Sequence, residues 1–269
     1  MKVVVIGDIE GVAGVVKRDQ VLAGEKLYDE ARRLYTEEMN AGVRGAFDAG
    51  AAEVVVMDCH GAGGDWSFNS LVPELIDPRC EYVVQQMWTE YTDFLREGCD
   101  AALLIGMHAK AGTPDGVLCH TVSGQSWRDL RFNGVSVGET GINAAFCGQW
   151  GCPVVLVTGD HAVCREARDL LGDSITTVEV KKGLSPYSAR TVPPARARDL
   201  IESGALRALE QRDSILPFDP GRPCEIQIEF HRVANVTEYR NRRGVEEIDD
   251  LTLMSSGEDW WTAWSQFFF

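Results

Sequence analysis

Histidines and carboxylates follow three short apolar runs of the chain, at the points where these runs end. The runs are residues 3–6, 54–57 and 101–105. The side chains that follow them are Asp8, Glu10, His60 and His108. Imidazole and carboxylate together suit zinc or a similar divalent ion, and a carboxylate with both oxygens free can bridge two ions roughly 3.5 to 4 Å apart. Asp8 is the best candidate for such a bridge, and the pattern predicts a metal-dependent hydrolase.

The apolar runs are predicted to be buried strands that bring these side chains together. In parallel α/β folds, ligands gather outside the carboxyl ends of the strands. Asp8 and Glu10 point the same way in an extended chain, and the flanking Gly7 and Gly11 leave the approach open.

Strands and helices alternate along most of the sequence, which predicts an α/β fold with a mainly parallel sheet flanked by helices. Further strands are expected at residues 82–84 and 154–157, a hairpin-like stretch at 116–137, and helices at 24–49, 139–150 and 162–171. Prolines punctuate the chain after residue 183. We therefore expect a metal-binding catalytic domain at 1–185 and a smaller C-terminal α+β lobe at 186–269. Within 186–269 we expect a helix at 195–210, a strand at 225–230 and a last helix from about residue 256.

Composition narrows the classes of partner. The 269 residues carry a formal net charge of −15, which disfavours binding to nucleic acid, since nonspecific affinity for phosphate backbones comes from clustered Lys and Arg. The apolar run at the N-terminus is too short for a signal peptide, and no stretch reaches the roughly 20 apolar residues of a membrane span. Eight scattered cysteines without a CxxC pair indicate reduced thiols. We expect a cytoplasmic protein without a membrane partner.

Each candidate ligand also has a purely structural explanation. Asp8 could cap a turn, His60 and His108 could be satisfied structural histidines, and a carboxylate at position 139 is favoured at the start of a helix in any case. His161 and His231 are interpreted as nonligands, because neither has supporting context.

Taken in order, these and further motifs resemble the D-aminopeptidase family of zinc metallopeptidases associated with bacterial dipeptide-transport operons. The matching motifs are Asp8-Ile9-Glu10-Gly11, Thr36-Glu37-Glu38, Asp58-Cys59-His60, Gly106-Met107-His108-Ala109, His120, Val137-Gly138-Glu139-Thr140-Gly141-Ile142-Asn143 and Gly159-Asp160. The similarity is dense up to about residue 185 and thin afterwards.

The resemblance implies a two-metal aminopeptidase that acts on small peptides or amino-acid amides. It implies one zinc held by Asp8, Glu10 and His60, and a second held by Asp8, His108 and Glu139. His120 would act beside the metals as acid/base or nucleophile, and of the two we prefer proton transfer to the leaving amine. Manganese or cobalt would fit the same ligands. A homo-oligomer, in this family a decamer, is implied as well.

Two other classes stay open at this point. The segment Gly7 to Gly11 differs by one residue from the Gly-Asp-x-His-Gly opening of metallophosphoesterases, although no Gly-Asn-His motif follows. A noncatalytic scaffold stabilised by metal is the second alternative, but such a site is normally closed and needs no free histidine such as His120. The sequence leaves open the D or L stereochemistry, the peptide length and the physiological metal.

Overall fold

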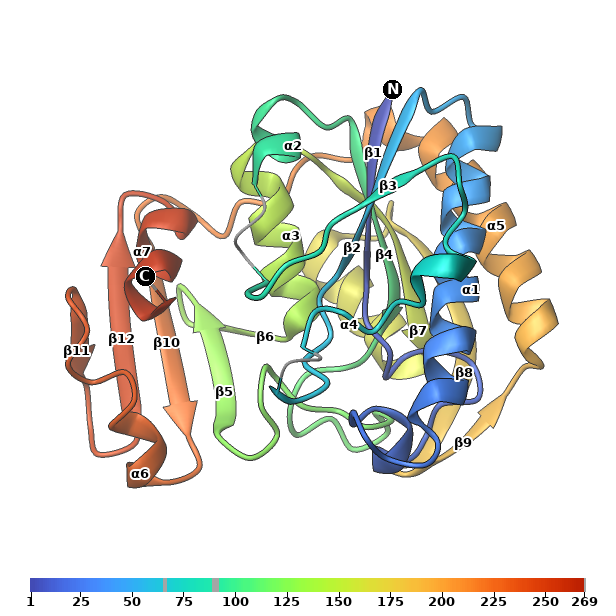
Figure 1. Cartoon of the computed structure of the whole chain (residues 1–269). Helices are drawn as coiled ribbons and strands as arrows, with labels where there is room; N and C mark the ends of the chain where they lie inside the picture. The colour runs from blue at the N-terminus through green and yellow to red at the C-terminus, as the bar shows by residue number, and fades with distance from the viewer. Residues whose placement is uncertain (65–66, 89–91, 269) are drawn as a thin grey trace.

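Two sheets organise the chain in a computed structural model that describes residues 1–64, 67–88 and 92–268 (Figure 1). The larger sheet has the strand order β3-β2-β1-β4-β7-β8-β9. Neighbouring strands run parallel except for the pair β8 and β9. The strands are β1 (Lys2–Gly7), β2 (Glu53–Asp58), β3 (Glu81–Tyr82), β4 (Ala101–Met107), β7 (Val154–Asp160), β8 (Thr176–Ser185) and β9 (Ser188–Thr191).

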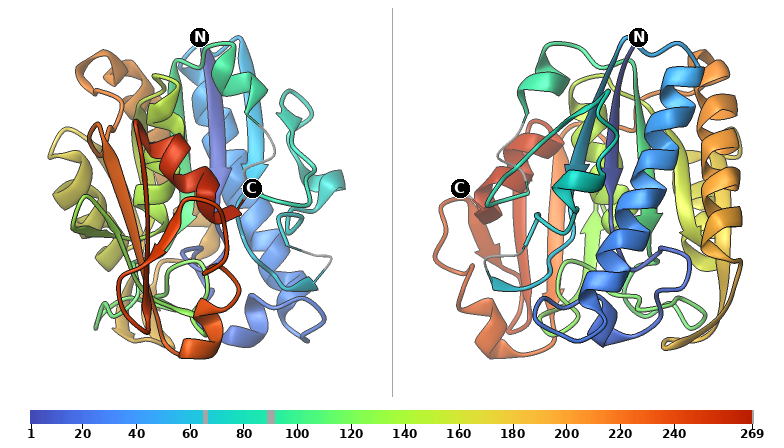
Figure 2. Two further views of the ribbon diagram at one scale, coloured as in Figure 1. Left: turned by 90° about the vertical axis from the view of Figure 1, so that its left-hand side faces the viewer. Right: turned by 45° about the vertical axis from the view of Figure 1, so that its right-hand side comes forward.

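Helices cover both faces of this sheet, which is why its central strands are almost entirely apolar. Side chains alternate along β1: Val3 and Val5 join the core under α1 (Tyr28–Asp48) and α5 (Pro194–Glu210), which lie side by side in Figure 2. Val4 and Ile6 join the core on the other face. That face is covered by α2 (Asp93–Arg96), α3 (Glu139–Gln149) and α4 (His161–Leu171).

The smaller sheet is antiparallel and packs through aromatic side chains. Its strand order is β11-β12-β10-β5-β6. The strands are β5 (Trp127–Phe132), β6 (Val135–Val137), β10 (Cys224–Phe230), β11 (Val245–Glu247) and β12 (Thr252–Gly257). The C-terminal helix α7 (Trp260–Phe268) lies against it, with the ring of Trp260 6.0 Å from that of Phe132. A short helix, α6 (Val233–Val236), follows β10. Short 3-10 turns occur at Arg18–Gln20, Pro73–Leu75 and Arg212–Ser214.

The expected fold class is confirmed, with differences in detail. The prediction of a helix from about residue 256 was wrong at its start, because residues 252–257 form β12 and the helix begins at Trp260. The two sheets do not separate at the predicted domain boundary. β5 and β6 precede residue 185 but pair in the smaller sheet, while α5 follows it and packs on the larger one. The division at 185 and 186 itself stays a prediction.

No helix within the described part of the chain combines the length and apolar character needed to cross a membrane. All eight cysteines carry free thiols.

Candidate metal centre

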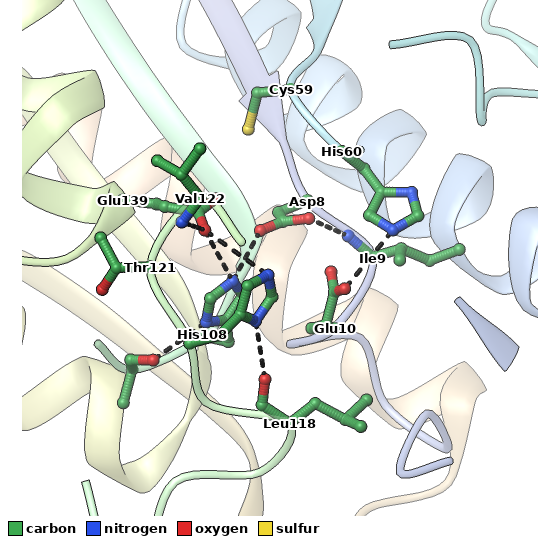
Figure 3. Close-up of polar contacts among 12 residues, drawn as sticks. Asp8, Ile9, Glu10, Cys59, His60, His108, Leu118, Thr121, Val122 and Glu139 are labelled. Carbon is green, nitrogen blue, oxygen red and sulfur yellow. Dashed lines mark hydrogen bonds and ion pairs between the residues drawn. The ribbon is translucent and has the colours of Figure 1, made fainter. Parts of the chain in front are cut away.

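The predicted ligands converge at the carboxyl ends of three neighbouring strands. β1 lies between β2 and β4, with Gly7 aligned to both Asp58 and Ile105. The residues that follow the three strands therefore emerge side by side. Figure 3 shows Asp8, Glu10, His60 and His108 facing a common centre, with Glu139 contributed by the first turn of α3.

Close backbone packing fixes the loops that carry these residues. The amide of Gly11 donates a hydrogen bond to the carbonyl oxygen of Gly106 (2.7 Å), and the amide of Asp8 donates to that of Ile105 (2.9 Å). A Cβ atom on Gly11 would overlap the carbonyl of Met107, and one on Gly106 would overlap that of Asp8. Gly106 also has a positive φ of 71°. Glycine is therefore required at both positions.

The carboxylate and imidazole side chains of this cluster approach one another closely. The Nε2 atom of His108 is 3.3 Å from Oδ2 of Asp8 and 3.4 Å from Oε1 of Glu139. The Nε2 atom of His60 is 3.4 Å from Oε1 of Glu10. Asp8, Glu10, His60 and His108 are all buried, and Glu139 is half-buried.

The second ring nitrogen of each histidine has its own partner. Nδ1 of His108 is 2.9 Å from the carbonyl oxygen of Ala109, and Nδ1 of His120 is 2.9 Å from that of Leu118. Because a carbonyl only accepts, Nδ1 carries a proton in both rings, and Nε2 is the nitrogen that faces the carboxylates. Nδ1 of His60 contacts Oγ of Ser70 at 2.8 Å. This is the arrangement by which proteins orient imidazole ligands for a metal.

The buried atoms that lack partners fit a cation. Asp8 Oδ2, Glu10 Oε2 and His108 Nε2 have no hydrogen-bond partner in the described structure, although such atoms are costly to bury unpaired. The ligand atoms of Asp8, Glu10 and His108 all lie within 4.8 Å of one another, as do those of His108, His120 and Glu139. His60 belongs to neither group but contacts Glu10. The donor set, imidazole nitrogen and carboxylate oxygen, suits zinc.

Burial and mutual charge shift the pKa values of these groups in opposite directions. Burial, together with the charge of Glu10, raises the pKa of Asp8 well above its usual range. Burial also acts to raise the pKa of Glu10, but the imidazoles of His60, His120 and His108 outweigh it, and the net shift is downward. Burial acts to lower the pKa of His108, but Glu139 and Asp8 outweigh it and raise the pKa well above its usual value. A concentration of negative charge is thus held out of water, as a cation site requires.

His120 lies at the accessible side of this cluster. Its ring stacks on that of His108 with centroids 4.2 Å apart, and its Nε2 atom is 3.7 Å from Oε1 of Glu139. The same Glu139 oxygen accepts a hydrogen bond from the amide of Val122 (2.8 Å). The imidazole of His120 is 23% exposed, so it can reach both the cluster and a bound molecule.

The sequence analysis missed two residues that position the ligands. Asp58 accepts hydrogen bonds from the amides of His60 and Ser70 and from the hydroxyl of Tyr35, and so fixes the turn that presents His60. Lys181 is buried, and its Nζ atom donates to the carbonyl oxygens of Glu10, Val12 and Val15. Asp58 belongs to the quoted motif and could have been found there. Lys181 lies within β8, a strand that was not predicted, and nothing in its local sequence indicates its contact with the ligand loop.

Three other polar residues named in the sequence analysis do not belong to this cluster. Both carboxylate oxygens of Asp160 accept backbone N–H groups, from Val163 (2.8 Å) and Val117 (2.7 Å), so its side chain is held by the backbone. His161 contacts Glu179 at 3.0 Å, and His231 is exposed at a separate surface depression.

A parallel α/β sheet with this cluster at its carboxyl edge places the chain among metal-dependent hydrolases. Comparison with known proteins narrows the class to one family. The family model Peptidase M55, described as D-aminopeptidase, matches residues 1–269. The chain belongs to this family. The expected class, a metal-dependent aminopeptidase, is thereby confirmed, and the phosphoesterase and scaffold alternatives are not favoured.

A sequence relative and a solved structure, both from Bacillus subtilis, agree with the family match. A D-aminopeptidase of Bacillus subtilis (strain 168) is 31% identical over 231 residues, which cover 86% of this chain and 81% of the relative. A solved structure described as the Zn-dependent D-aminopeptidase DppA from Bacillus subtilis, a self-compartmentalizing protease, superposes with a TM-score of 0.90 at 28% identity. That match covers 99% of this chain and 95% of the other.

Proposed function

We propose that this chain is a two-zinc D-aminopeptidase that hydrolyses the N-terminal amide bond of small peptides. The observation that carries the proposal is the buried, unpartnered set Asp8 Oδ2, Glu10 Oε2 and His108 Nε2, which has the composition and spacing of a metal site in a chain of the D-aminopeptidase family.

We assign Asp8, Glu10 and His60 to one ion and Asp8, His108 and Glu139 to the other, with Asp8 shared. Bound divalent ions would supply a nucleophile at neutral pH and polarise the scissile carbonyl. Manganese or cobalt could use the same ligands.

His120 is assigned the proton transfer. The hydrogen bond from its Nδ1 to Leu118 leaves Nε2 free toward the cluster, where it can give a proton to the leaving amine. An amine that departs unprotonated would be an unstable anion. Asp160 does not line the cavity beside the cluster, whereas Glu10 does, so we assign the substrate's α-ammonium group to Glu10.

The solved relative supports an assembly. That protein is self-compartmentalizing, and we propose that this chain likewise forms a closed homo-oligomer, a decamer, that admits small peptides in the cytoplasm. The molecular mass of the full chain in solution, from light scattering, tests the decamer directly.

The function is tested by metal content and stereospecific cleavage. The purified full-length protein should contain about two zinc ions per chain, as two-metal hydrolases do, and should cleave D-aminoacyl p-nitroanilides and D-dipeptides until a chelator removes the metal. L-enantiomers should be poor substrates. Absence of metal together with absence of cleavage would overturn the proposal.

A His120→Ala variant separates the catalytic role from a structural one. General acid catalysis typically contributes about 10²- to 10⁴-fold, so kcat should fall by that factor while the zinc content is retained. Unchanged kcat would remove His120 from the mechanism.

A further inference from the structure

A cavity of about 270 Å³ opens directly beside the metal centre. One side of it is formed by metal-site residues, among them Asp8, Glu10, His60, His120 and Glu139. The other side is formed by apolar side chains, which we call the apolar wall: Phe68, Met87, Trp88, Ile142, Trp264 and Phe268. A cavity that combines a few polar groups with an apolar lining is typical of a site for a small organic ligand.

The apolar wall is assembled from three distant parts of the chain and is held by aromatic contacts. The rings of Trp264 and Phe268, both on α7, are 4.7 Å apart. Trp88 lies edge-on to Trp264 at 6.2 Å and contacts Phe146 of α3 at 4.9 Å. Trp264 is only 2% exposed. The wall therefore has a fixed shape before any ligand binds.

Backbone strain is concentrated at the same cavity. Among the described residues, four non-glycine residues have positive φ, and two of them, Phe68 (63°) and Val122 (58°), line the cavity. For a β-branched residue such as valine this conformation is a genuine outlier. Strain of this kind persists where the surrounding structure enforces it and is commonly found at ligand sites. It adds a second observation, independent of the lining, that marks the cavity as a binding site.

The size of the cavity fits one residue with a large side chain. At about 270 Å³ it is far larger than a single water molecule, which takes roughly 30 Å³ of liquid, so it can hold a side chain much larger than a methyl group. An aminopeptidase has a single residue on the N-terminal side of the scissile bond. A cavity of this size beside the cluster can receive that residue.

The lining also determines which side chains are accepted. Apart from the metal-site residues, none of the described residues that line the cavity carries a charge. A Lys, Asp or Glu side chain would bury its charge against the apolar wall without a partner, which is strongly unfavourable. An aromatic or large aliphatic side chain would replace water there with apolar contact.

We propose that this cavity is the specificity pocket for the N-terminal residue of the substrate and that it selects a large apolar side chain, with α7 as its far wall. The inference rests on the proposed aminopeptidase function and extends it from a reaction to a substrate class.

The test compares amides that differ only in the N-terminal side chain. D-phenylalanine amide and D-alanine amide release the same leaving group, ammonia. For the oligomeric zinc-loaded enzyme, we expect kcat/KM to be on the order of 100-fold higher for D-phenylalanine amide than for D-alanine amide, and at least about 10-fold higher. A single methylene in an apolar pocket already contributes roughly 10- to 200-fold. The kcat/KM for the dipeptide D-Phe-D-Ala should likewise exceed that for D-Ala-D-Phe.

Two substitutions in the same segment test whether the apolar wall determines the substrate preference. Met87, 38% exposed, lines the cavity, whereas Val84, 70% exposed, does not. Met87→Asp should lower the ratio of kcat/KM for D-phenylalanine amide over D-alanine amide by about tenfold, the order of one lost methylene contact. Val84→Asp introduces the same charge and should leave the ratio unchanged.

The outcomes separate the two proposals. Chelator-sensitive cleavage with equal or greater preference for D-alanine amide, or preference set by the second residue, would overturn the pocket assignment alone. An unchanged ratio in Met87→Asp would do the same. No cleavage of any amide or dipeptide by the zinc-loaded enzyme would overturn the proposed function and the pocket with it.

Discussion

The carboxyl edge of the larger sheet and the apolar wall meet at one cavity but are built by opposite means. The edge buries polar atoms that lack hydrogen-bond partners, Asp8 Oδ2, Glu10 Oε2 and His108 Nε2, and a bound cation would compensate them. The wall buries aromatic rings that compensate one another by contact, as Trp264 does with Phe268 and Trp88.

The two regions therefore tolerate change differently. Removal of one member from a buried charged set leaves the remaining members uncompensated, at a cost of several kcal/mol. A change in the wall alters the shape of a pocket and costs less. Chemistry should depend on the edge and substrate preference on the wall, and each of the following variants tests this separation.

Asp8→Asn should have the largest effect. Asp8 faces His108 and is the residue we assign to both ions. A neutral amide cannot replace a bridging carboxylate, and the loss of several kcal/mol of charge stabilisation lowers kcat/KM by at least about a thousandfold. Metal analysis of the purified variant should show fewer ions per chain. Full metal content with full activity would contradict the central position of Asp8.

Glu38→Gln should change the pH dependence of stability. Glu38 is buried beside the ligand loop, where its Oε1 accepts the amide of Ala13 (2.9 Å), and burial raises its pKa from 4.5 to about 7. Between these two values the folded protein binds the proton and the unfolded chain releases it, so the free energy of unfolding of the wild type falls as the pH rises. The fall amounts to about 3 kcal/mol.

The glutamine variant has no proton to lose at this position. Urea unfolding at pH 5 and pH 8, at one fixed zinc concentration, should therefore show the variant gaining on the wild type by about 3 kcal/mol toward the higher pH. Glu37→Gln, on the same helix, controls for the change in net charge. A constant difference between Glu38→Gln and the wild type at both pH values would rule out the buried titration.

Lys181→Met should weaken zinc binding, although Lys181 is not assigned as a ligand. Its ammonium group holds the carbonyl oxygens of Glu10, Val12 and Val15, and methionine fills similar space without donating to them. Loss of an outer contact to a metal ligand typically costs about 10- to 100-fold in metal affinity or activity. Competition with a chelator measures the zinc affinity. The exposed neighbour variant Lys182→Met should match the wild type, and equal affinities in both variants would contradict a positioning role.

Phe268→Leu should have the smallest effect and should act on preference alone. Phe268 lines the cavity, while its neighbour Phe267 is fully buried away from it. The leucine variant should keep its zinc and lose about tenfold in preference for D-phenylalanine amide over D-alanine amide. Phe267→Leu makes the same change off the cavity and should preserve the preference. Loss of zinc in Phe268→Leu would contradict the separation of the two regions.

The side chains at the carboxyl edge of the larger sheet could be predicted because the sequence pattern that indicates them is local. Asp8, Glu10, His60 and His108 each follow an apolar run directly, and parallel strands bring their carboxyl ends to one edge. Glu139 and His120 are different, because neither spacing nor periodicity connects them to the cluster. They were predicted from the family resemblance, and the structure places them 3.4 and 3.7 Å from their neighbours in it.

The smaller sheet could not be predicted in the same way. β5 pairs with β10, which lies about a hundred residues later in the chain, and no local pattern encodes such a pairing; β6 joins the sheet through β5. The start of the last helix was misplaced for a related reason. The segment 252–257 is short and mixed in polarity, and it forms a strand because it pairs with β10.

The sequence by itself determined the buried strands β1, β2 and β4, the loops that end them and thus the side chains that meet at the carboxyl edge of the larger sheet, because these depend on hydrophobic periodicity and on the geometry of parallel strands. Only the tertiary structure decided the contacts of Lys181, the apolar wall and the cavity it encloses. Phe68, Trp88 and Trp264 are brought together by packing among three segments far apart in the chain, and such packing is a property of the assembled core.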